Sequence, residues 1–370
     1  MKKITALGLS VLFMCFASAY ALPPEVANWG LAWSDEFDGT SLDTVNNWSY
    51  DTGAVYNQEQ ELYKRACVEV SNGRLIIWSK HNLYGVTYPS GRIDTHDKQI
   101  FTYGYFEAAI QGPIGTGANG PALWSAVWLL GNSINHGVAW PTCGEMELYE
   151  QRTGPQNESG SCAPAAPGDN LFIGTCHYGV GGGPSYHSCA YDNKSCLCGG
   201  FHKYAILWDP SFVKYYFDDK LYWGPDFPAG CGTPSIISAD NQVAFSSPFY
   251  WIINAAVGGN YQGPNIDNSI FPTHMDLDYV RVYQQNAPVV KNPRGQHTLQ
   301  SCALINPSTA QLRVYDLNGK LVADYTNRVR QMKAGDNVMK KMPSTLSNGA
   351  YVVKLVDNGK TVSQRLVSAR

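Results

Sequence analysis

Short runs of alternating or uniformly apolar residues recur along this chain, and each run is bounded by Gly, Pro, Asn or Asp. Examples of such runs are residues 74–79, 103–110, 204–208, 213–217, 249–256 and 277–283. The three-to-four-residue period of an amphipathic helix is almost absent, so the pattern predicts β-strands. Strands of this length and number usually stack as two antiparallel sheets. The sequence therefore predicts an all-β fold, a concanavalin-like β-jelly-roll sandwich with a concave face.

The distribution of charge divides the chain into two parts. Its 370 residues are more than one hydrophobic core usually supports. Residues 22–287 hold 12 Lys and Arg against 26 Asp and Glu and contain all ten Trp, whereas residues 288–370 hold 13 against 4. Near 285–295 aromatic residues give way to Pro and basic residues. We therefore expect a first domain at 22–287 and a second at 288–370.

The second domain carries two hairpin signals. Residues 312–325 and 351–367 place alternating apolar residues around Asn318-Gly319 and Asn358-Gly359, and together they predict a small β-sandwich. The sequences LRVYDLNGKLV and GAYVVKL, followed by a basic end, resemble the C-terminal sorting or surface-attachment domains of some exported bacterial enzymes. The resemblance implies contact with secretion or cell-surface machinery. An inert spacer or a carbohydrate-binding module is the alternative, although a binding module would need exposed aromatic platforms.

The first 21 residues have the form of an export signal. Lys2 and Lys3 precede an apolar run at 4–16, and the small-residue pattern Ala19-Tyr20-Ala21 follows. The run is shorter than the ~20 residues of a membrane-spanning helix, and no later stretch is long enough. We therefore expect residues 1–21 to be removed, and the mature protein to be secreted or held at the cell surface without a transmembrane segment.

Six cysteines crowd a Gly- and Pro-rich part of the first domain. They are Cys162, Cys176, Cys189, Cys196, Cys198 and Cys231. Export permits disulfides, and crosslinks would stabilise a long irregular loop. Zinc is the competing interpretation, but export and the Cys-X-Cys spacing of Cys196 and Cys198 favour disulfides. Their pairing stays open, as does the state of Cys302.

Three carboxylates lie in one apolar, strand-like segment, WPTCGEMELYE at 140–150. In an extended strand Glu145 and Glu147 share a face, roughly 7 Å apart, and two like charges at that distance tend to raise one pKa. Glu150 has the wrong parity, so in a regular strand it would point into the sandwich, where an unpaired carboxylate is costly. A one-residue β-bulge near Leu148 and Tyr149 would return Glu150 to the face of the other two.

Such a carboxylate group suits the hydrolysis of sugars. A retaining glycoside hydrolase needs two carboxyls about 5 to 5.5 Å apart across the substrate groove, one as nucleophile and one as acid and base. The many aromatic residues, 10 Trp, 23 Tyr and 13 Phe, suit ligands with flat or apolar faces, of which sugar rings are one kind. The alternative is a solvated acidic edge strand, but such an edge is not normally interleaved with Met, Leu and Tyr.

Ten blocks of sequence, in one order across residues 29–284, resemble glycoside hydrolase family 16 and especially its laminarinase-like β-1,3-glucanases. The blocks are WSDEFDGTSLD at 33–43, NQEQELY at 57–63, SGRIDT at 90–95, YGYFEA at 103–108, LWSAVWLLG at 123–131, the carboxylate segment, IGTCHYG at 173–179, FHKYAILWDP at 201–210, WIINAAVGG at 251–259 and MDLDYVRVYQ at 275–284. The resemblance implies a substrate cleft on the concave face and endo-acting, retaining hydrolysis of β-1,3 or mixed β-1,3-1,4 glucan, with no cofactor required for catalysis.

The resemblance also implies roles for the three carboxylates. Glu145 would be the nucleophile, Glu150 the acid and base, and Glu147 the assisting carboxylate that orients the nucleophile. The family usually has Asp where this chain has Glu147, and the extra methylene would move that carboxyl by roughly 1.5 Å. The two residues between Glu147 and Glu150 match the bulged form of the family motif, which is typical of laminarinase-like members.

Substrate-binding residues are expected in the same way. Trp124 and Trp128 lie four residues apart and so share one face of their strand, where they could stack on glucosyl units. Either could instead be a core residue, and the resemblance favours the cleft for both. The resemblance adds Asn57, Arg92 and His177, and more weakly Asn254 and Tyr261. Trp140, next to Pro141 at the start of the carboxylate segment, is expected at the cleft rim or in a structural role. Arg92 could equally anchor a salt bridge, and His177 could be a structural histidine.

Family members often hold one calcium on the convex side. The corresponding positions here are Glu36, Gly73 and Asp278, with backbone oxygens near the first block and the carboxylate of Asp278 as ligands. Asp278 could instead cap a turn or pair with Arg281. The sequence therefore predicts a structural calcium only through the resemblance.

Other functions fit parts of the pattern. A family 16 enzyme can act on another polysaccharide such as agarose, carrageenan or xyloglucan, or transfer glycosyl units, and the same sandwich can bind sugar without turnover. A surface adhesin would need the basic second domain to bind cell-wall polymer. The net charge of −3 argues against a nucleic-acid-binding protein, and the sequence shows no phosphate-cradling glycine motif or Ser-His-Asp pattern.

Overall fold

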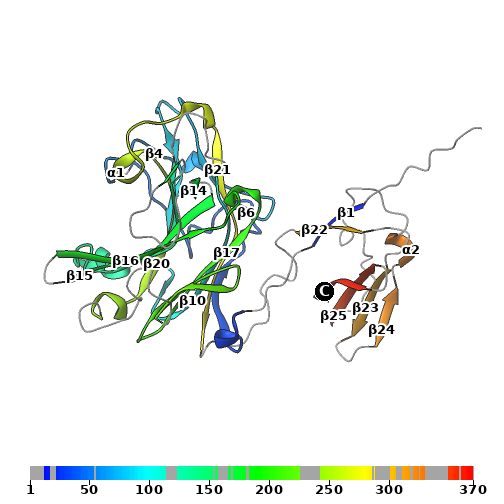
Figure 1. The fold of residues 1–370 in the computed structure, drawn as a ribbon. Helices are drawn as coiled ribbons and strands as arrows, with labels where there is room; N and C mark the ends of the chain where they lie inside the picture. Colours follow the sequence, from blue (N-terminus) through cyan, green and yellow to red (C-terminus); the bar gives the residue numbers. More distant parts are fainter. Residues whose placement is uncertain are drawn as a thin grey trace, which may run out of the picture. The chain divides into compact units, whose positions relative to one another are not determined.

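The computed structural model describes residues 22–53, 56–113, 123–152, 170–180, 183–225 and 242–285 together with Ala287, Lys320 and the further elements named below. The chain forms two compact units, one of Ala21–Lys291 and one of Met1–Tyr20 with Asn292–Arg370. Figure 1 shows both units. The division at Lys291 lies close to the boundary expected from the change in composition.

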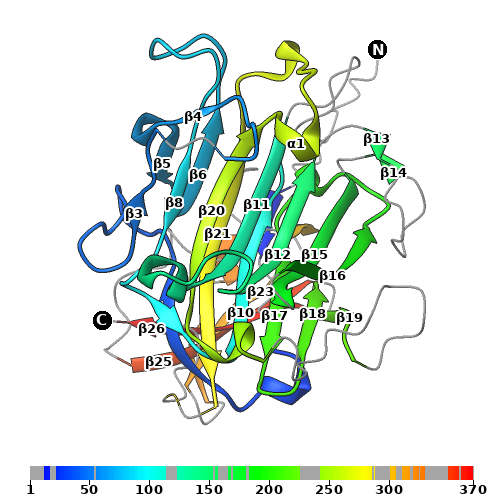
Figure 2. The ribbon, with the colours of Figure 1, turned by 90° about the vertical axis from the view of Figure 1, so that its left-hand side faces the viewer.

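Two eight-stranded antiparallel sheets build the larger unit. We name the first the cleft sheet, and Figure 2 looks onto it. Its strands, in spatial order, are β16 (Gly183–Asp192), β15 (Leu171–Val180), β12 (Glu145–Arg152), β11 (Leu123–Gly131), β20 (Phe249–Val257), β8 (Arg92–Asp94) and β3 (Ser49–Tyr50), with β9 (Ile100–Phe101) also paired to β20. The apolar runs at 213–217, 249–256 and 277–283 all lie in strands, which confirms the predicted all-β sandwich.

We name the second the back sheet, because it covers the opposite side of the core. Its strands are β19 (Lys220–Trp223), β18 (Val213–Phe217), β17 (His202–Trp208), β10 (Gly104–Gln111), β21 (Thr273–Gln284), β6 (Arg74–Ser79) and β5 (Val68–Ser71), with β2 (Gly30–Asp35) also paired to β21. Short connecting elements are β4 (Leu62–Tyr63), β7 (Pro89–Ser90), β13 (Pro155–Gln156), β14 (Ala166–Pro167), α1 (Gly259–Gln262) and 3-10 turns at Pro24–Val26, Arg65–Cys67, Asn132–His136, Leu197–Gly199, Ala244–Ser246 and Asn268–Ile270.

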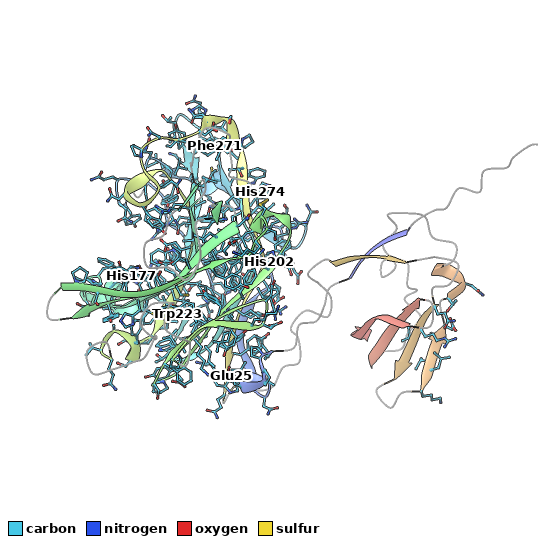
Figure 3. The ribbon with its side chains drawn as sticks, in the orientation of Figure 1. Glu25, His177, His202, Trp223, Phe271 and His274 are labelled. Atoms are coloured by element: carbon cyan, nitrogen blue, oxygen red, sulfur yellow. A yellow bond between two sulfur atoms is a disulfide. The ribbon has the colours of Figure 1, made fainter. Side chains whose placement is uncertain are left out.

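One continuous hydrophobic core lies between the two sheets. Val127 and Leu129 enter it from β11, and Phe106 and Ile110 enter it from β10. The alternation along β11 therefore leaves Trp124, Ala126, Trp128 and Leu130 on the other face of the cleft sheet, because successive strand side chains point to opposite sides. Figure 3 shows side chains filling the space between the sheets, with the fully buried Trp223 among them.

The chain directly after the expected export signal packs against the back sheet. Leu22 and Trp29 contact a cluster on β10, β17 and β18. Glu25, labelled in Figure 3, accepts hydrogen bonds from Tyr216 and, at 2.8 Å, from Lys214. This segment therefore belongs to the larger unit.

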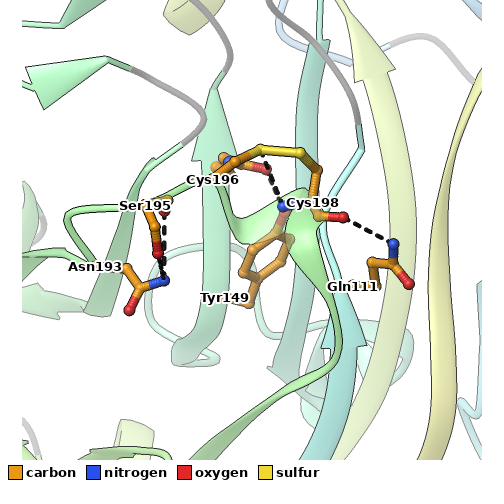
Figure 4. The surroundings of a disulfide bond; sticks show 7 residues. Gln111, Tyr149, Asn193, Ser195, Cys196 and Cys198 are labelled. Atoms are coloured by element: carbon orange, nitrogen blue, oxygen red, sulfur yellow. Dashed lines mark hydrogen bonds between the residues drawn. A yellow bond between two sulfur atoms is a disulfide. The ribbon is translucent and has the colours of Figure 1, made fainter. Parts of the chain in front are cut away.

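The cysteine prediction holds in part. Cys196 and Cys198 form a disulfide, and Figure 4 shows the Cys198 carbonyl accepting a 2.8 Å hydrogen bond from Gln111. The expectation of disulfides is wrong for Cys176 and Cys189, which are buried thiols. Their segment is not an irregular loop but the paired strands β15 and β16, so both side chains point into the core instead of across a loop. Cys162 and Cys231 lie outside the described residues.

The smaller unit contains the two predicted hairpins. β23 (Gln311–Asp316) pairs with β24 (Leu321–Asp324), and β25 (Gly349–Asp357) pairs with β26 (Lys360–Ala369). These strands form a four-stranded sheet in the order β24-β23-β25-β26, accompanied by α2 (Thr326–Val329). β1 (Leu12–Phe16) pairs with β22 (Ser301–Ile305). Within the described residues, we find no helix that has the length and apolar character to cross a membrane.

Candidate active site

A cleft of about 930 Å³ runs across the exposed face of the cleft sheet. Its lining brings together every catalytic and substrate-binding residue expected from the sequence. These are Glu145, Glu147, Glu150, Trp124, Trp128, Asn57, Arg92, His177 and Trp140, together with Asn254 and Tyr261. A concave surface of this size with aromatic walls and a few convergent polar groups is typical of a ligand site.

A β-bulge on β12 puts the three carboxylates on one face. Val127 of β11 lies opposite Tyr149, whereas the next residue, Trp128, lies opposite Glu147, so Leu148 is the extra residue of the ladder. Leu148 and Tyr149 both enter the core although they are consecutive. The bulge is therefore where the parity of Glu150 predicts it.

Of the three clustered carboxyl groups, that of Glu147 is expected to carry a proton. Burial raises the pKa of Glu147 well above its ordinary value, and the charges of Glu150 and Glu145 raise it further. Burial and the charge of Glu150 also raise the pKa of Glu145, but hydrogen bonds from Trp140 and Glu147 oppose that rise. Because two ionised carboxylates cannot hydrogen-bond to each other, Glu147 donates and Glu145 accepts.

Glu150 is held from the neighbouring strand. Trp124 Nε1 on β11 donates a 2.9 Å hydrogen bond to Oε1 of Glu150. The Trp124 ring packs edge-on against Tyr261, 5.2 Å between ring centroids, and Arg152 lies 4.4 Å from the Tyr261 ring centroid. One carboxyl oxygen of Glu150 is thus fixed by an indole N–H, while the residue lines the open cleft.

Trp128 and Arg92 form the wall on the other side of β11. Trp128 Nε1 donates a 2.8 Å hydrogen bond to Asn254 Oδ1, and the Arg92 guanidinium lies 5.3 Å from the Trp128 ring centroid. Arg92 Nε also lies 2.8 Å from Oδ2 of Asp51, and its guanidinium lies 4.5 Å from the ring of Tyr56. Arg92 is therefore a salt-bridge anchor that also lines the cleft, and its contact with sugar hydroxyls stays a prediction.

His177 and Trp140 lie near Glu145. His177 is on β15, which borders β12 on the side away from β11. His177 Nε2 lies 3.6 Å from Oε1 of Glu145, and the His177 and Trp140 rings lie 5.8 Å apart. Burial lowers the pKa of His177 to about 4, so its ring is neutral at neutral pH. Trp140 keeps nearly half of its surface exposed and lines the cleft.

A second carboxyl pair adjoins the cleft, and sequence reasoning did not identify it. Burial, followed by the charge of Glu59, raises the pKa of Glu61 to about 9, so Glu61 carries a proton at neutral pH. The Val257 N–H donates a 2.7 Å hydrogen bond to Glu61. Tyr63 and Asn57 donate to Glu59 at 3.3 and 3.2 Å. The pair thus fixes Asn57, one of the expected sugar-binding residues.

Glu36, Gly73 and Asp278 are the positions where the resemblance implies calcium. Glu36 forms a two-pronged ion pair with Arg281, with both N–O distances at 2.9 Å, and Asp278 is buried on β21. No group of three or more His, Cys, Asp or Glu that could hold a metal exists among the described residues. Since backbone oxygens would supply most of the ligands, the calcium remains a prediction from the resemblance.

Two family models match this chain. The model of the glycosyl hydrolases family 16 matches residues 47–223, and that of the secretion system C-terminal sorting domain matches residues 292–369. Both matches fall on the units that the structure separates.

Similar proteins point to the same family. A β-glucanase from Rhodothermus marinus is 35% identical over 294 residues, which cover 77% of this chain and 95% of the relative. The crystal structure of laminarinase from Flavobacterium sp. UMI-01 is 31% identical with a TM-score of 0.53, covering 69% of this chain and all of the other. The catalytic domain of an endo-1,3-β-glucanase from Thermotoga petrophila RKU-1 is 30% identical with a TM-score of 0.55, covering 70% and 98%.

Proposed function

Because this chain belongs to family 16 of the glycosyl hydrolases, we propose that it is an endo-acting glucanase that cleaves β-1,3 or mixed β-1,3-1,4 glucan with retention of configuration. Its relatives include enzymes named β-glucanase and laminarinase. The observation that carries the proposal is the bulge at Leu148, which gathers Glu145, Glu147 and Glu150 on the floor of an aromatic-lined cleft.

In the first step Glu145 is the nucleophile. Glu145 reacts in its ionised form, which the hydrogen bonds from Trp140 and Glu147 favour against the effect of burial. Its carboxylate attacks the anomeric carbon while Glu150 gives its proton to the departing glycosidic oxygen. The bond from carbon to that oxygen breaks, and an ester between the sugar and Glu145 forms. The hydrogen bond from Trp124 to Oε1 supports this role, because it holds the carboxyl group of Glu150 in place where this residue lines the cleft.

In the second step water replaces Glu145. Glu150, now ionised, accepts a proton from the water, whose oxygen attacks the anomeric carbon and releases Glu145 as a carboxylate. Two inversions at the same carbon restore the original configuration. Glu147 stays protonated and orients Glu145 by its hydrogen bond.

The cleft walls supply binding and position. Trp124, Trp128 and Trp140 present aromatic surface to sugar faces, and Asn57 and Arg92 present hydrogen-bond donors to hydroxyl groups. Holding the sugar beside Glu145 lowers the entropy cost of attack. The walls therefore supply the binding surface that the proposed reaction needs.

The test is release of reducing ends from laminarin. Glu145→Gln and Glu150→Gln, each in the full chain, should lower the rate at least about a hundredfold, because each removes a group that forms or breaks a bond. Glu69→Gln on the back sheet is a matched control, since Glu69 is exposed there. Undiminished release by either cleft variant contradicts the proposal.

Azide rescue separates the two roles. With a substrate that has an activated leaving group, azide in the Glu145→Ala variant should attack the anomeric carbon of the substrate directly, displace the leaving group and give an α-glycosyl azide. In the Glu150→Ala variant, azide should attack the anomeric carbon of the ester between the sugar and Glu145, release Glu145 and give a β-glycosyl azide. The opposite assignment of products would exchange the two roles, and product anomers followed by NMR in the unchanged enzyme would show retention or inversion directly.

The C-terminal sorting domain indicates export or a cell-surface location. We propose in addition that residues 1–21 are removed on export and that residues 288–370 address the chain to secretion or cell-surface machinery. Mass spectrometry of the exported protein should find Leu22 at its N-terminus. A chain that lacks residues 288–370 should fold and cleave glucan but stay inside cells that export the full chain.

A further inference from the structure

Among the described residues, few large aromatic side chains are strongly exposed. Tyr56, Tyr84, Trp140 and Tyr186 are 42%, 49%, 47% and 64% exposed, and all but Tyr84 line the cleft. Tyr186 is the most exposed of the four. An aromatic face left open in a concave site is a surface for the apolar face of a ligand.

The alternation along β16 shows that the core does not need an aromatic side chain at position 186. Cys189 and Tyr191 point into the core. A 2.7 Å hydrogen bond joins Nε2 of His187 to the hydroxyl group of the buried Tyr178. Tyr186 and Ser188 lie on the other face and line the cleft. Because the neighbouring cleft-facing residue is a serine, a small polar residue would serve the fold at position 186.

Tyr186 ends a row of rings that starts beside the catalytic carboxylates. Its ring centroid lies 5.7 Å from that of His177, and Trp140 flanks His177 at 5.8 Å. His177, labelled in Figure 3, lies on β15, between β12 and β16, with its Nε2 3.6 Å from Glu145 Oε1. The three rings therefore form an apolar floor from Glu145 toward the edge of the sheet.

The order of strands locates this floor. β16 is the edge strand and lies two strand spacings from β12, roughly 10 Å at about 4.8 Å each. On the other side, three spacings separate β12 from β8, whose Arg92 stacks against Tyr56. The cleft thus crosses the strands with one exposed tyrosine near each end, and the carboxylates lie nearer to Tyr186.

We propose that Tyr186 is a stacking platform for a glucosyl unit of a β-glucan chain at the β16 end of the cleft, outside the units held at the carboxylates. The proposal rests on the proposed function of the same cleft. A long chain reaches the edge strand and contacts the platform, whereas the shortest cleavable oligosaccharide does not. Tyr186 therefore sets a preference for long substrates.

The test compares substrates of different length. For Tyr186→Ala, KM on laminarin should rise about three- to tenfold, the effect of one aromatic contact, with kcat unchanged. KM on the shortest oligosaccharide that is cleaved should stay within a factor of two. Tyr186→Phe should behave as the unchanged enzyme, because stacking needs the ring and not the hydroxyl.

A matched control and a structural readout accompany the kinetics. Tyr84→Ala removes a tyrosine of similar exposure that does not line the cleft, and it should leave every KM unchanged. If Tyr186 only props His177 and Glu145, Tyr186→Ala should change kcat and the pH profile equally for short and long substrates. That result, or an unchanged KM on laminarin, overturns the proposal.

Binding without turnover separates this proposal from the proposed function. In the Glu145→Gln background, calorimetry with laminarin should show weaker binding when Tyr186→Ala is added. Equal binding by the two variants overturns the platform even if the enzyme cleaves glucan as proposed. If the unchanged enzyme cleaves no glucan, the proposed function fails, and a lower laminarin affinity of the Tyr186 variant still supports the platform.

Discussion

Trp124 Nε1 on β11 donates a 2.9 Å hydrogen bond to Glu150 Oε1 on β12, across adjacent strands and next to the bulge at Leu148. The bond needs the bulge, because a regular β12 would carry Glu150 to the core side of the sheet. Trp124 thus lines the cleft as a proposed sugar-binding residue and also positions Glu150, the proposed acid and base.

Removing the indole N–H of Trp124 should slow the cleavage of laminarin. Trp124→Phe keeps a ring in the cleft but removes the N–H, so kcat/KM on laminarin should fall about ten- to a hundredfold, the effect of a hydrogen bond to a carboxyl group that becomes charged as it gives up its proton. Trp128→Phe is the comparison, since it removes the bond to Asn254 instead and should act mainly on KM. Equal kcat losses in both variants would show that the bond to Glu150 has no special part.

Glu147 should work as a neutral hydrogen-bond donor. Glu147→Gln keeps a donor without charge, so kcat should stay within about tenfold of the unchanged enzyme. Glu147→Leu has similar volume but no donor and should lose about a hundredfold. Steady-state rates across pH 5 to 8 would measure both variants. If Gln and Leu have the same effect, the hydrogen bond to Glu145 is not what this residue contributes.

The buried pair Glu59 and Glu61 should make stability fall as pH rises. The folded pKa of Glu61 is raised to about 9, so its contribution is complete below the unfolded pKa near 4.5 and is lost as pH rises toward 9. Glu61→Gln cannot ionise, and its amide can still donate to Glu59. Its stability advantage should grow by at least roughly 1.4 kcal/mol, one pKa unit, between pH 5 and 8.

Urea unfolding at several pH values would measure this advantage. Glu69→Gln is the control, because hydrogen bonds from Ser71 and Trp78 lower the pKa of the exposed Glu69. That variant should show no gain on raising the pH. A Glu61→Gln curve parallel to that of the unchanged protein would mean that Glu61 is already ionised at neutral pH.

Two histidines should titrate in opposite directions from the ordinary value. Burial lowers the pKa of His177 to about 4, whereas a hydrogen bond to Asp276 raises that of His274. NMR titration should therefore separate the two rings by more than two units. The linked stability follows: the His177 contribution is lost as pH falls from about 6.5 toward 4, and the His274 contribution is lost as pH rises through its raised value. A His177 midpoint near 6.5 would mean that its ring is well solvated.

The sequence predicts best where one strand rule decides the outcome. The parity of Glu150 locates the bulge, and the Asn-Gly pairs locate the hairpins β23-β24 and β25-β26. The sequence motifs did not predict Tyr186 as a cleft residue. Alternation from Cys189 along the same strand could have placed it on the cleft face. Parity becomes useful only when one residue of the strand is already known to enter the core.

Contacts between distant segments were beyond local patterns. Glu59 meets the end of β20 through an isolated bridge to Gly258, so the burial of the Glu59 and Glu61 pair depends on a segment about two hundred residues away. The cysteine-rich segment looked like a loop because Gly and Pro punctuate it, but the strand pairs β15 and β16 continue through Cys176 and Cys189. Long-range pairing overrode local composition in both places.

Cys67, Cys143, Cys176 and Cys189 are reduced and buried in a protein whose sorting domain indicates passage out of the cell. The closed sandwich keeps oxidants and partner thiols away from these sulfurs, but a chain still being translocated leaves them open to wrong crosslinks. Folding of the two sheets during export therefore competes kinetically with oxidation of the thiols. Variants that fold slowly should accumulate outside the cell as mixed disulfides.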